Sequence, residues 1–366
     1  MEIFSEMSHL GHENLLFLQH KESGLKAVLA IHDSSLGPAV GGIRFWKYQF
    51  DSDAILDALE LAETASLTAA LLDCDLGGGQ VIVLASPEEK NEVMLRALGA
   101  YIHGLGGRFI ATAEIGTTND DLLILRKETT HVVGGGFSSG AVELGKYSAQ
   151  GVFLGMRAAA KTAFGSDNLK GRSIGILGME SIGLSLTKLL FSAGARVFVS
   201  DFSFERVKLA KDRFPEVEMV PPANLLEMPL DVLSPCGVGD ILIPENVGKF
   251  KCKVIAGSSG NHFGAEKIIE KLHAAGIWCV PDFMLNAGDM IMVDSSLRHH
   301  PPESILSRIE NMYGMVERLF AQVRERKQNP VKVAKEWAWD RMKKTRSLKK
   351  IFRPPSVGRA QMGGPV

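Results

Sequence analysis

The sequence predicts an α/β protein of two domains, the second of which contains a doubly wound parallel sheet. Between residues 172 and 201, a short apolar run, a glycine-bearing turn, a helical pattern and a second apolar run follow one another. Strand-like and helix-like segments continue to alternate as far as residue 288, which is typical of a parallel sheet. A chain of 366 residues is long enough for two domains.

The bulk composition is that of an ordinary globular protein. Hydrophobic residues make up 45% of the chain and charged residues 23%, and the net charge of -1 gives no indication of a nucleic-acid partner. The N-terminal segment lacks the features of a signal peptide, and no apolar run could span a membrane, so we expect a cytoplasmic protein. The cysteines lack metal-ligand spacing, so we expect no metal site and reduced, buried thiols at Cys74, Cys236, Cys252 and Cys279.

The N-terminal part of the chain predicts mixed strands and helices. We expect strands at residues 15–17, 25–31, 81–84 and 108–111 and helices at residues 51–65 and 92–103. In the first helix we expect Asp53 to act as the cap and Ile55, Leu56, Leu59 and Ala62 to share the buried face. Gly41 and Gly42 precede a strand, where they either admit a small ligand or form a tight turn. The glycines at residues 77–79 predict a tight turn into a buried strand.

The C-terminal part predicts the alternation of a doubly wound sheet. The glycine-rich stretch at residues 134–140 is a candidate hinge. After it we expect helices at residues 146–163, 204–213, 265–275, 305–326 and 330–352 and strands at residues 230–233, 254–256 and 278–281. Several strands end in Gly, Ser or Asn, at the edge where such sheets bind ligands.

A damaged dinucleotide-binding fingerprint lies at the start of the parallel sheet. Gly178 and Gly183 hold the first and third positions of G-x-G-x-x-G, and Asp201 ends the next strand, where an acid accepts hydrogen bonds from a ribose diol. The variable positions hold Met179, Ser181 and Ile182. Glu180 replaces the middle glycine and brings bulk and negative charge to a diphosphate site, where it could itself satisfy the helix N-terminus. The sequence predicts a Rossmann-type domain that binds NAD rather than NADP, because Asp201 would repel a 2′-phosphate; a domain that keeps its shape without binding dinucleotide is the alternative.

Several motifs in fixed order resemble those of one enzyme family. They are Gly37-Pro-Ala-Val-Gly-Gly42, Leu76-Gly-Gly-Gly79, Glu114-Ile-Gly-Thr-Thr118, the βαβ unit, Ser234-Pro-Cys236 and Asn286-Ala-Gly288. Together they resemble the Glu/Leu/Phe/Val amino-acid dehydrogenases, in particular the leucine dehydrogenases. The resemblance implies NAD-linked oxidative deamination of apolar L-amino acids by a homo-oligomer. It also implies a substrate and oligomerisation domain at residues 1–140, completed by the helix at 330–352, an NAD domain at 141–329 and a tail at 353–366.

The resemblance also implies a set of site residues, and this chain departs from it at the catalytic positions. The family uses one lysine to hold the substrate carboxylate, a second lysine as general base and an aspartate that assists proton transfer. Thr68, Gln80 and Glu114 stand at those positions here. Losing a general base typically costs about 10²–10⁴-fold in rate, so we expect deamination to be absent or very slow.

Further positions concern the two ligands. The resemblance assigns Gly41 and Gly42 to the substrate, and Cys236, Asn261 and Asn286 to the cofactor site. Around that site the family's threonine, first asparagine and second glycine become Ser148, Gly260 and Asp289.

The sequence leaves three functions open. The first is an NAD-linked oxidoreductase with altered chemistry, in which Glu114 either survives as an acid or base or is a solvated carboxylate. The second is a non-catalytic homologue that acts as a subunit partner or binds a small molecule. The third, a conventional dehydrogenase, is disfavoured by Thr68 and Gln80. The basic segment at residues 341–353 is either a solvated helix face or a site for an anionic partner.

Overall fold

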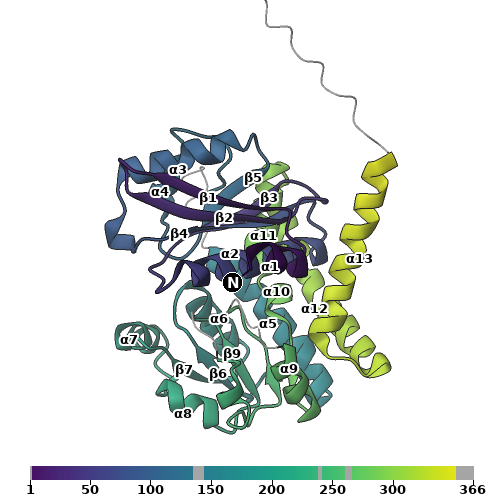
Figure 1. Ribbon diagram of the computed structural model, residues 1–366. Helices are drawn as coiled ribbons and strands as arrows, with labels where there is room; N and C mark the ends of the chain where they lie inside the picture. Colours follow the sequence, from purple (N-terminus) through teal and green to yellow (C-terminus); the bar gives the residue numbers. More distant parts are fainter. Residues whose placement is uncertain (1, 135–143, 238–240, 260–265, 352–366) are drawn as a thin grey trace, which may run out of the picture.

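The computed structural model describes residues 2–134, 144–237, 241–259 and 266–351, and Figure 1 shows them as two lobes, each built on one sheet. The upper lobe contains a five-stranded mixed sheet in the order β1-β2-β4-β3-β5. The lower lobe contains a six-stranded sheet in the order β11-β10-β9-β6-β7-β8, and every pairing in it is parallel. The predicted α/β class with a parallel sheet is therefore confirmed.

The N-terminal sheet has antiparallel and parallel halves. Its strands are β1 (Asn14–His20), β2 (Leu25–Asp33), β3 (Ala39–Phe45), β4 (Gly77–Val83) and β5 (Phe109–Ala113). β2 pairs antiparallel with β1 and β4, whereas β3 pairs parallel with β4 and β5. The helices α1 (Ile3–Leu10), α2 (Asp51–Leu71), α3 (Glu92–Gly104) and α4 (Asn119–Leu125) complete this lobe.

The tight turn predicted at residues 77–79 is wrong, and so is the turn that was one of the two alternatives for Gly41 and Gly42. The glycines at residues 77–79 belong to β4, whose seven residues are all buried, and Gly41 and Gly42 lie inside β3. A Cβ on Gly78 would lie 2.2 Å from the backbone N of Ser66 on α2, and one on Gly79 would lie 2.8 Å from the ring of Phe109. These glycines bring β4 close to its neighbours, so the absence of a side chain serves packing here.

Two predictions about α2 are also wrong. Asp53 does not cap the helix, because α2 begins at Asp51 and its N-cap is Phe50, which provides no side-chain hydrogen bond. Leu56 is 36% exposed, whereas Ile55, Leu59 and Ala62 are buried together with Ala54 and Ala58, so the buried face is turned away from Leu56. The helix also continues to Leu71 and therefore includes Thr68.

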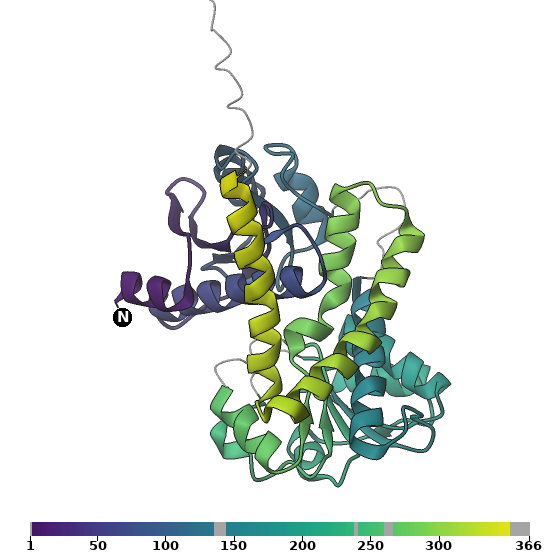
Figure 2. The same ribbon diagram turned by 90° about the vertical axis from the view of Figure 1, so that its right-hand side faces the viewer.

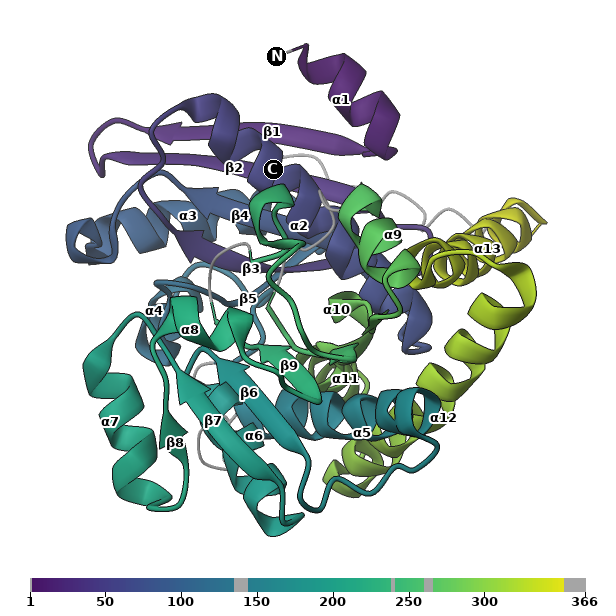
Figure 3. The same ribbon diagram turned by 90° about the horizontal axis from the view of Figure 1, so that it is seen from below.

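The parallel sheet contains the predicted strands and helices in their predicted sequence order, together with β8, α8, α10 and α11, which were not predicted. Its strands are β6 (Ser173–Leu177), β7 (Arg196–Ser200), β8 (Glu218–Met219), β9 (Val232–Pro235), β10 (Val254–Ile255) and β11 (Trp278–Cys279). Its helices are α5 (Leu144–Phe164), α6 (Ser181–Ser192), α7 (Phe204–Arg213), α8 (Pro222–Glu227), α9 (Glu266–Ala274), α10 (Asp282–Leu285) and α11 (Ala287–Leu297). Seen from below, β6, β7 and β9 lie side by side (Figure 3). Most of the candidate hinge at residues 134–140 lies outside the described residues.

The closing helices α12 (Pro302–Arg326) and α13 (Pro330–Ile351) return the chain to the N-terminal lobe, and Figure 2 shows α13 running up alongside it. Arg341 contacts the carboxylates of Asp73 and Asp75 at 3.1 and 2.9 Å, and Arg346 pairs with Asp33, which is 1% exposed. Part of the basic segment is thus engaged inside the molecule. This supports its interpretation as a helix face rather than as a site for an anionic partner.

A buried histidine pair lies beneath α13. The Nε2 atom of His12 is 2.9 Å from the carbonyl oxygen of Leu59, and that of His32 is 3.0 Å from the carbonyl oxygen of Leu10. The two ring centroids are 4.7 Å apart, and the ring of His32 also meets that of Trp339. Burial lowers the pKa of both histidines from 6.5 to about 4.

Candidate functional site

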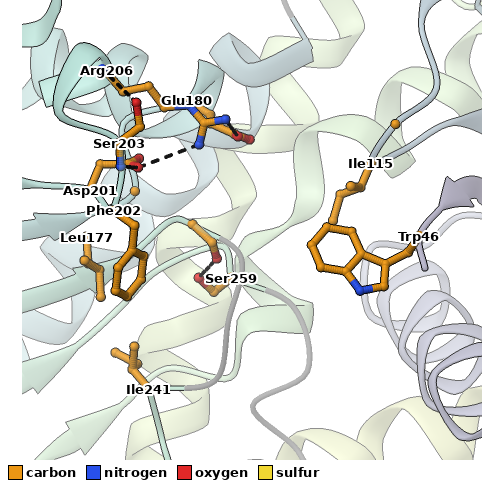
Figure 4. A pocket seen from close by; sticks show the side chains of 13 residues that line it. Trp46, Ile115, Leu177, Glu180, Asp201, Phe202, Ser203, Arg206, Ile241 and Ser259 are labelled. Atoms are coloured by element: carbon orange, nitrogen blue, oxygen red, sulfur yellow. Dashed lines mark hydrogen bonds and ion pairs between the residues drawn. The ribbon is translucent and has the colours of Figure 1, made fainter. Parts of the chain in front are cut away.

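A cavity of about 700 Å³ opens between the two lobes (Figure 4). Trp46, Ile115 and Gly116 line it from the N-terminal lobe. The facing wall follows the carboxyl edge of the parallel sheet and is lined by Leu177, Gly178, Glu180, Asp201, Phe202, Ser203, Arg206, Gly237, Ile241 and Ser259. This edge is where doubly wound sheets bind ligands, so the cavity is the candidate site.

The loop from β6 to α6 approaches its neighbours so closely that two positions require glycine. A Cβ on Gly178 would lie 2.2 Å from the backbone N of Gly237, and the φ of Gly178 is 104°. A Cβ on Gly183 would lie 1.9 Å from the carbonyl oxygen of Gly178. The retained glycines of the fingerprint therefore preserve the tight turn and the close helix packing that a dinucleotide site needs.

Asp201 stands at the end of β7, but in this structure its carboxylate is bonded to backbone. It accepts hydrogen bonds from the N–H groups of Met179 (2.7 Å) and Ser203 (2.8 Å), and the side chain is 7% exposed. The carboxylate ties the fingerprint loop to the next strand, at the position where the sequence predicts a contact with ribose. Ser181 and Ile182 form the first turn of α6 beside it.

Glu180 does not satisfy the helix N-terminus, contrary to one interpretation of the sequence. It is the N-cap of α6, yet its side chain makes no capping hydrogen bond. Its carboxylate instead lies 2.7 Å from the guanidinium of Arg206, which projects from α7 (Figure 4). The sequence analysis missed Arg206, although Asp201 and Arg206 are only five residues apart.

Polar groups without protein partners lie near the same sheet edge. Among the described residues, Ser258 Oγ and Asn286 Oδ1 are buried and have no hydrogen-bond partner, an arrangement that a polar ligand would complete. Cys236 is also buried; its Sγ lies 3.5 Å from Ser234 Oγ, and burial raises the pKa of the thiol, which favours packing over nucleophilic chemistry. Asn261 lies outside the described residues.

Two residues that differ from the family pattern, Asp289 and Ser148, contact each other. Ser148 Oγ donates a hydrogen bond of 3.0 Å to the Asp289 carboxylate across the contact between α5 and α11. Burial raises the pKa of Asp289. A Cβ on Gly288 would lie 2.2 Å from the backbone N of Ser148, so the two helices are in close contact at this point.

The N-terminal lobe brings Gly42, Gln80 and Glu114 together beside Ile115 of the cavity lining, although these three residues do not line the cavity themselves. A Cβ on Gly42 would lie 2.3 Å from Glu114 Cβ and 3.6 Å from Gln80 Oε1, so the glycine leaves room for the glutamate. Gly41 faces the other way, where a Cβ would lie 1.8 Å from the carbonyl oxygen of Gly79. Of the two glycines, Gly42 is therefore the one beside the other candidate residues.

Glu114 is held by an arginine that the sequence analysis missed. Arg44 donates two hydrogen bonds of 2.8 Å to its carboxylate and a third, of 2.7 Å, to Asp57. Burial opposes the charge of Arg44, but these two carboxylates raise its pKa. The arrangement restrains Glu114 through both of its oxygen atoms, unlike a solvated carboxylate. Arg44 lies two residues beyond Gly42 on the same strand, and that spacing was the available signal.

Thr68 and Gln80 offer neutral groups in buried positions. Thr68 is 5% exposed and Gln80 is 4% exposed. Thr68 Oγ1 donates to the carbonyl oxygen of Thr64 at 2.8 Å, and Gln80 Nε2 lies 3.4 Å from the carbonyl oxygen of Val81. Neither side chain titrates near neutral pH, so neither can serve as a general base.

The described part of the chain contains neither a metal-ligand cluster nor a membrane-spanning helix. No cluster of His, Cys, Asp and Glu side chains there could hold a metal ion. None of the helices in that part of the chain is long and apolar enough to cross a membrane.

Comparisons with known proteins agree on one family. Residues 12–131 match the model of the Glu/Leu/Phe/Val dehydrogenase dimerisation domain, and residues 199–349 match that of Glutamate/Leucine/Phenylalanine/Valine dehydrogenase. Leucine dehydrogenase from Geobacillus stearothermophilus is 37% identical over 355 residues, which cover 96% of each chain. L-Tryptophan dehydrogenase from Nostoc punctiforme is 32% identical over 350 residues, covering 95% of this chain and 98% of that one. A crystal structure of L-tryptophan dehydrogenase from the same organism matches with a TM-score of 0.77 and 29% identity, covering 94% of this chain and 99% of that one.

Proposed function

This chain belongs to the Glu/Leu/Phe/Val dehydrogenase family, as its motifs predicted, and we propose that it is a leucine-dehydrogenase-like homologue that binds NAD but deaminates amino acids very slowly or not at all. Relatives named leucine, phenylalanine and tryptophan dehydrogenase support the dehydrogenase-like part of the proposal. The loss of deamination rests on the N-terminal wall of the site.

One observation supports the proposed loss of deamination. At the positions where the resemblance places two lysines, the chain has the buried, neutral side chains of Thr68 and Gln80. The nearby carboxylate, Glu114, is bonded through both oxygens to Arg44. A general base must be free to take a proton from a bound water or substrate, and a carboxylate paired with a guanidinium is a poor one. These side chains therefore provide neutral hydrogen-bonding groups and a paired carboxylate, and they provide no free group for proton transfer.

The opposite wall supports binding of a dinucleotide, in agreement with the proposed NAD site. NAD, when bound, supplies a hydride acceptor. The N-terminus of α6 would face the diphosphate, and the Asp201 carboxylate would hold the ribose diol after releasing a backbone N–H. Asn286 and Ser258 offer buried polar atoms that still lack a partner. Glu180 opposes the fit, because its carboxylate adds negative charge beside the position of the diphosphate.

Calorimetric titration of NAD⁺ and NADH into the pure protein tests the first half of the proposal. We expect saturable binding to one site per chain. Absence of binding up to about 1 mM, the weak end of the usual affinity range, would contradict it and favour a scaffold that binds protein partners.

Turnover tests the second half. We expect no robust NAD-linked oxidation of leucine, valine or phenylalanine, and such oxidation by the wild-type protein would contradict the loss of deamination. The variant Thr68→Lys/Gln80→Lys is the matched comparison, because it restores both lysines in the same chain. Activity gained by this variant would localise the loss to these two positions. If it gains none, the loss extends to Glu114 and the cofactor wall.

We also propose that the protein forms a homo-oligomer. The match of residues 12–131 to a domain described as a dimerisation domain supports this. Light scattering coupled to size-exclusion chromatography is expected to give a multiple of the 39.7 kDa chain mass, and a monomer at every concentration would contradict the proposal.

A further inference from the structure

Glu180 and Arg206 form an ion pair across the mouth of the candidate dinucleotide site. Glu180 occupies the turn between β6 and α6, and Arg206 lies in the first turn of α7. Their charged atoms are 2.7 Å apart, and both residues line the cavity (Figure 4). Each side chain is 48% exposed, so the pair is able to open when a ligand arrives.

Arg206 is shared between two carboxylates. Its second guanidinium nitrogen lies 3.7 Å from Asp201 Oδ1, whose own carboxylate accepts hydrogen bonds from Met179 and Ser203. The three charged groups therefore sum to one negative charge at a place where a dinucleotide brings further negative charges. Arg206 offsets part of the repulsion that Glu180 adds.

The position of Arg206 also concerns the ribose. An acid at the end of the second strand favours a free 2′-hydroxyl, whereas an arginine beside it accommodates a 2′-phosphate. Arg206 lies beside Asp201 as such an arginine would, but its closer partner is Glu180. While Glu180 is paired with the guanidinium, Arg206 binds a 2′-phosphate less strongly.

We propose that Glu180, by pairing with Arg206, sets the affinity of this site for dinucleotides and biases it toward NAD over NADP. This inference rests on the proposed function, since it requires that the cavity bind a dinucleotide. It assigns the residue that replaces a fingerprint glycine to cofactor selection. Glu180 is thus a specificity-determining residue that acts through Arg206.

The test compares NAD⁺ and NADP⁺ binding by calorimetry in four proteins: wild type, Glu180→Gln, Arg206→Met and the double variant. Glu180→Gln keeps the size of the side chain and removes its charge. We expect it to tighten NADP⁺ about tenfold and NAD⁺ less, because it frees the guanidinium and removes a repulsive charge. Arg206→Met should weaken both ligands, and in the double variant the NADP⁺ gain should disappear.

Two controls separate this effect from a general change of the protein. Arg196→Met removes a similar surface ion pair, with Glu218, that lies away from the cavity, and it should leave both affinities unchanged. Raising the ionic strength to about 1 M should shrink the difference between wild type and Glu180→Gln, because half-exposed charges are screened. Thermal melting of each variant without ligand checks that the fold is retained.

The outcomes distinguish the inference from the proposed function. If wild type binds NAD⁺ and Glu180→Gln leaves the NAD⁺ to NADP⁺ affinity ratio unchanged, the inference is overturned and the proposed function stands. If wild type binds neither dinucleotide but Glu180→Gln binds one, Glu180 controls the site and NAD binding by the natural protein is overturned. Absence of binding by every variant overturns both.

Discussion

The two walls of the cavity use glycine for different purposes. On the parallel-sheet wall, Gly178 and Gly183 admit neighbouring backbone, at 2.2 and 1.9 Å from where a Cβ would stand. In the N-terminal lobe, next to the cavity lining, Gly42 admits a side chain, that of Glu114, at 2.3 Å from where a Cβ would stand. A site shaped by backbone keeps its form when exposed side chains such as Glu180 change. A site whose chemistry depends on particular side chains is more vulnerable, and we propose that deamination is lost in this way through Thr68 and Gln80.

Substitution of Gly183 should have the largest effect, because backbone cannot move aside as a side chain can. We expect Gly183→Val to lower the free energy of unfolding by about 3 kcal/mol or more and to abolish NAD binding. Gly314→Ala on α12 is the control, since no atom lies within 4 Å of its Cβ position, and it should stabilise slightly. Urea denaturation and calorimetry give both quantities. Wild-type stability of the Gly183→Val protein would contradict the claim that neighbouring backbone requires glycine at this position.

Substitution of Arg44 should have the second-largest effect on stability, because its guanidinium binds both Glu114 and Asp57. Arg44→Met removes the guanidinium that binds Glu114 and Asp57, whose side chains are 25% and 14% exposed. We expect a loss of about 3 kcal/mol in the free energy of unfolding. The double variant Arg44→Met/Glu114→Gln should recover part of it, because one orphaned charge is gone. Equal stabilities of the single and double variants in urea denaturation would show that Glu114 gains nothing from the pair.

The histidine pair makes the N-terminal lobe sensitive to acid. Burial lowers the pKa of His12 and His32 from 6.5 to about 4, so the unfolded chain binds more protons than the folded chain between these values. Their contribution to stability is complete above pH 6.5 and is lost as the pH falls toward 4. We expect the free energy of unfolding to fall by about 1.4 kcal/mol per pH unit for each histidine that titrates.

Urea denaturation across that pH window measures the slope. His32→Gln should reduce it, whereas substitution of the exposed His9 by glutamine should not. If His32→Gln leaves the pH dependence of the free energy of unfolding unchanged, the histidine pair is not the cause of the acid sensitivity.

The smallest change in stability is expected for a substitution on α13, that of Arg346. Arg346 is 54% exposed and its partner Asp33 is 1% exposed, and Asp33 also accepts hydrogen bonds from Ser35. Arg346→Gln should therefore cost only about 1 kcal/mol in the free energy of unfolding and leave ligand binding unchanged. Urea denaturation gives the first quantity, and a titration with NAD⁺ gives the second. A change in NAD affinity would show that the walls are coupled through this helix.

Local patterns predicted most of the elements and the character of the site. The helix at residues 204–213 has the predicted bounds, and the predicted strands of the parallel sheet are present apart from the short, unpredicted β8, because periodicity and turn residues act over a few positions. The identity of Thr68 and Gln80 was enough to predict a wall without lysine chemistry. That prediction needs no coordinates, because neither residue can titrate near neutral pH.

Pairing between distant residues was decided by the tertiary structure. Glu114 meets Arg44 across 70 positions because β3 and β5 are neighbours, and a strand pattern alone does not give that order. The glycines at residues 77–79 looked like a turn, because their role depends on α2 and Phe109 approaching from other parts of the chain. The sequence by itself determined which chemical groups are present in the protein. Only the packing of sheets and helices decided which of those groups are paired and which remain available to a ligand.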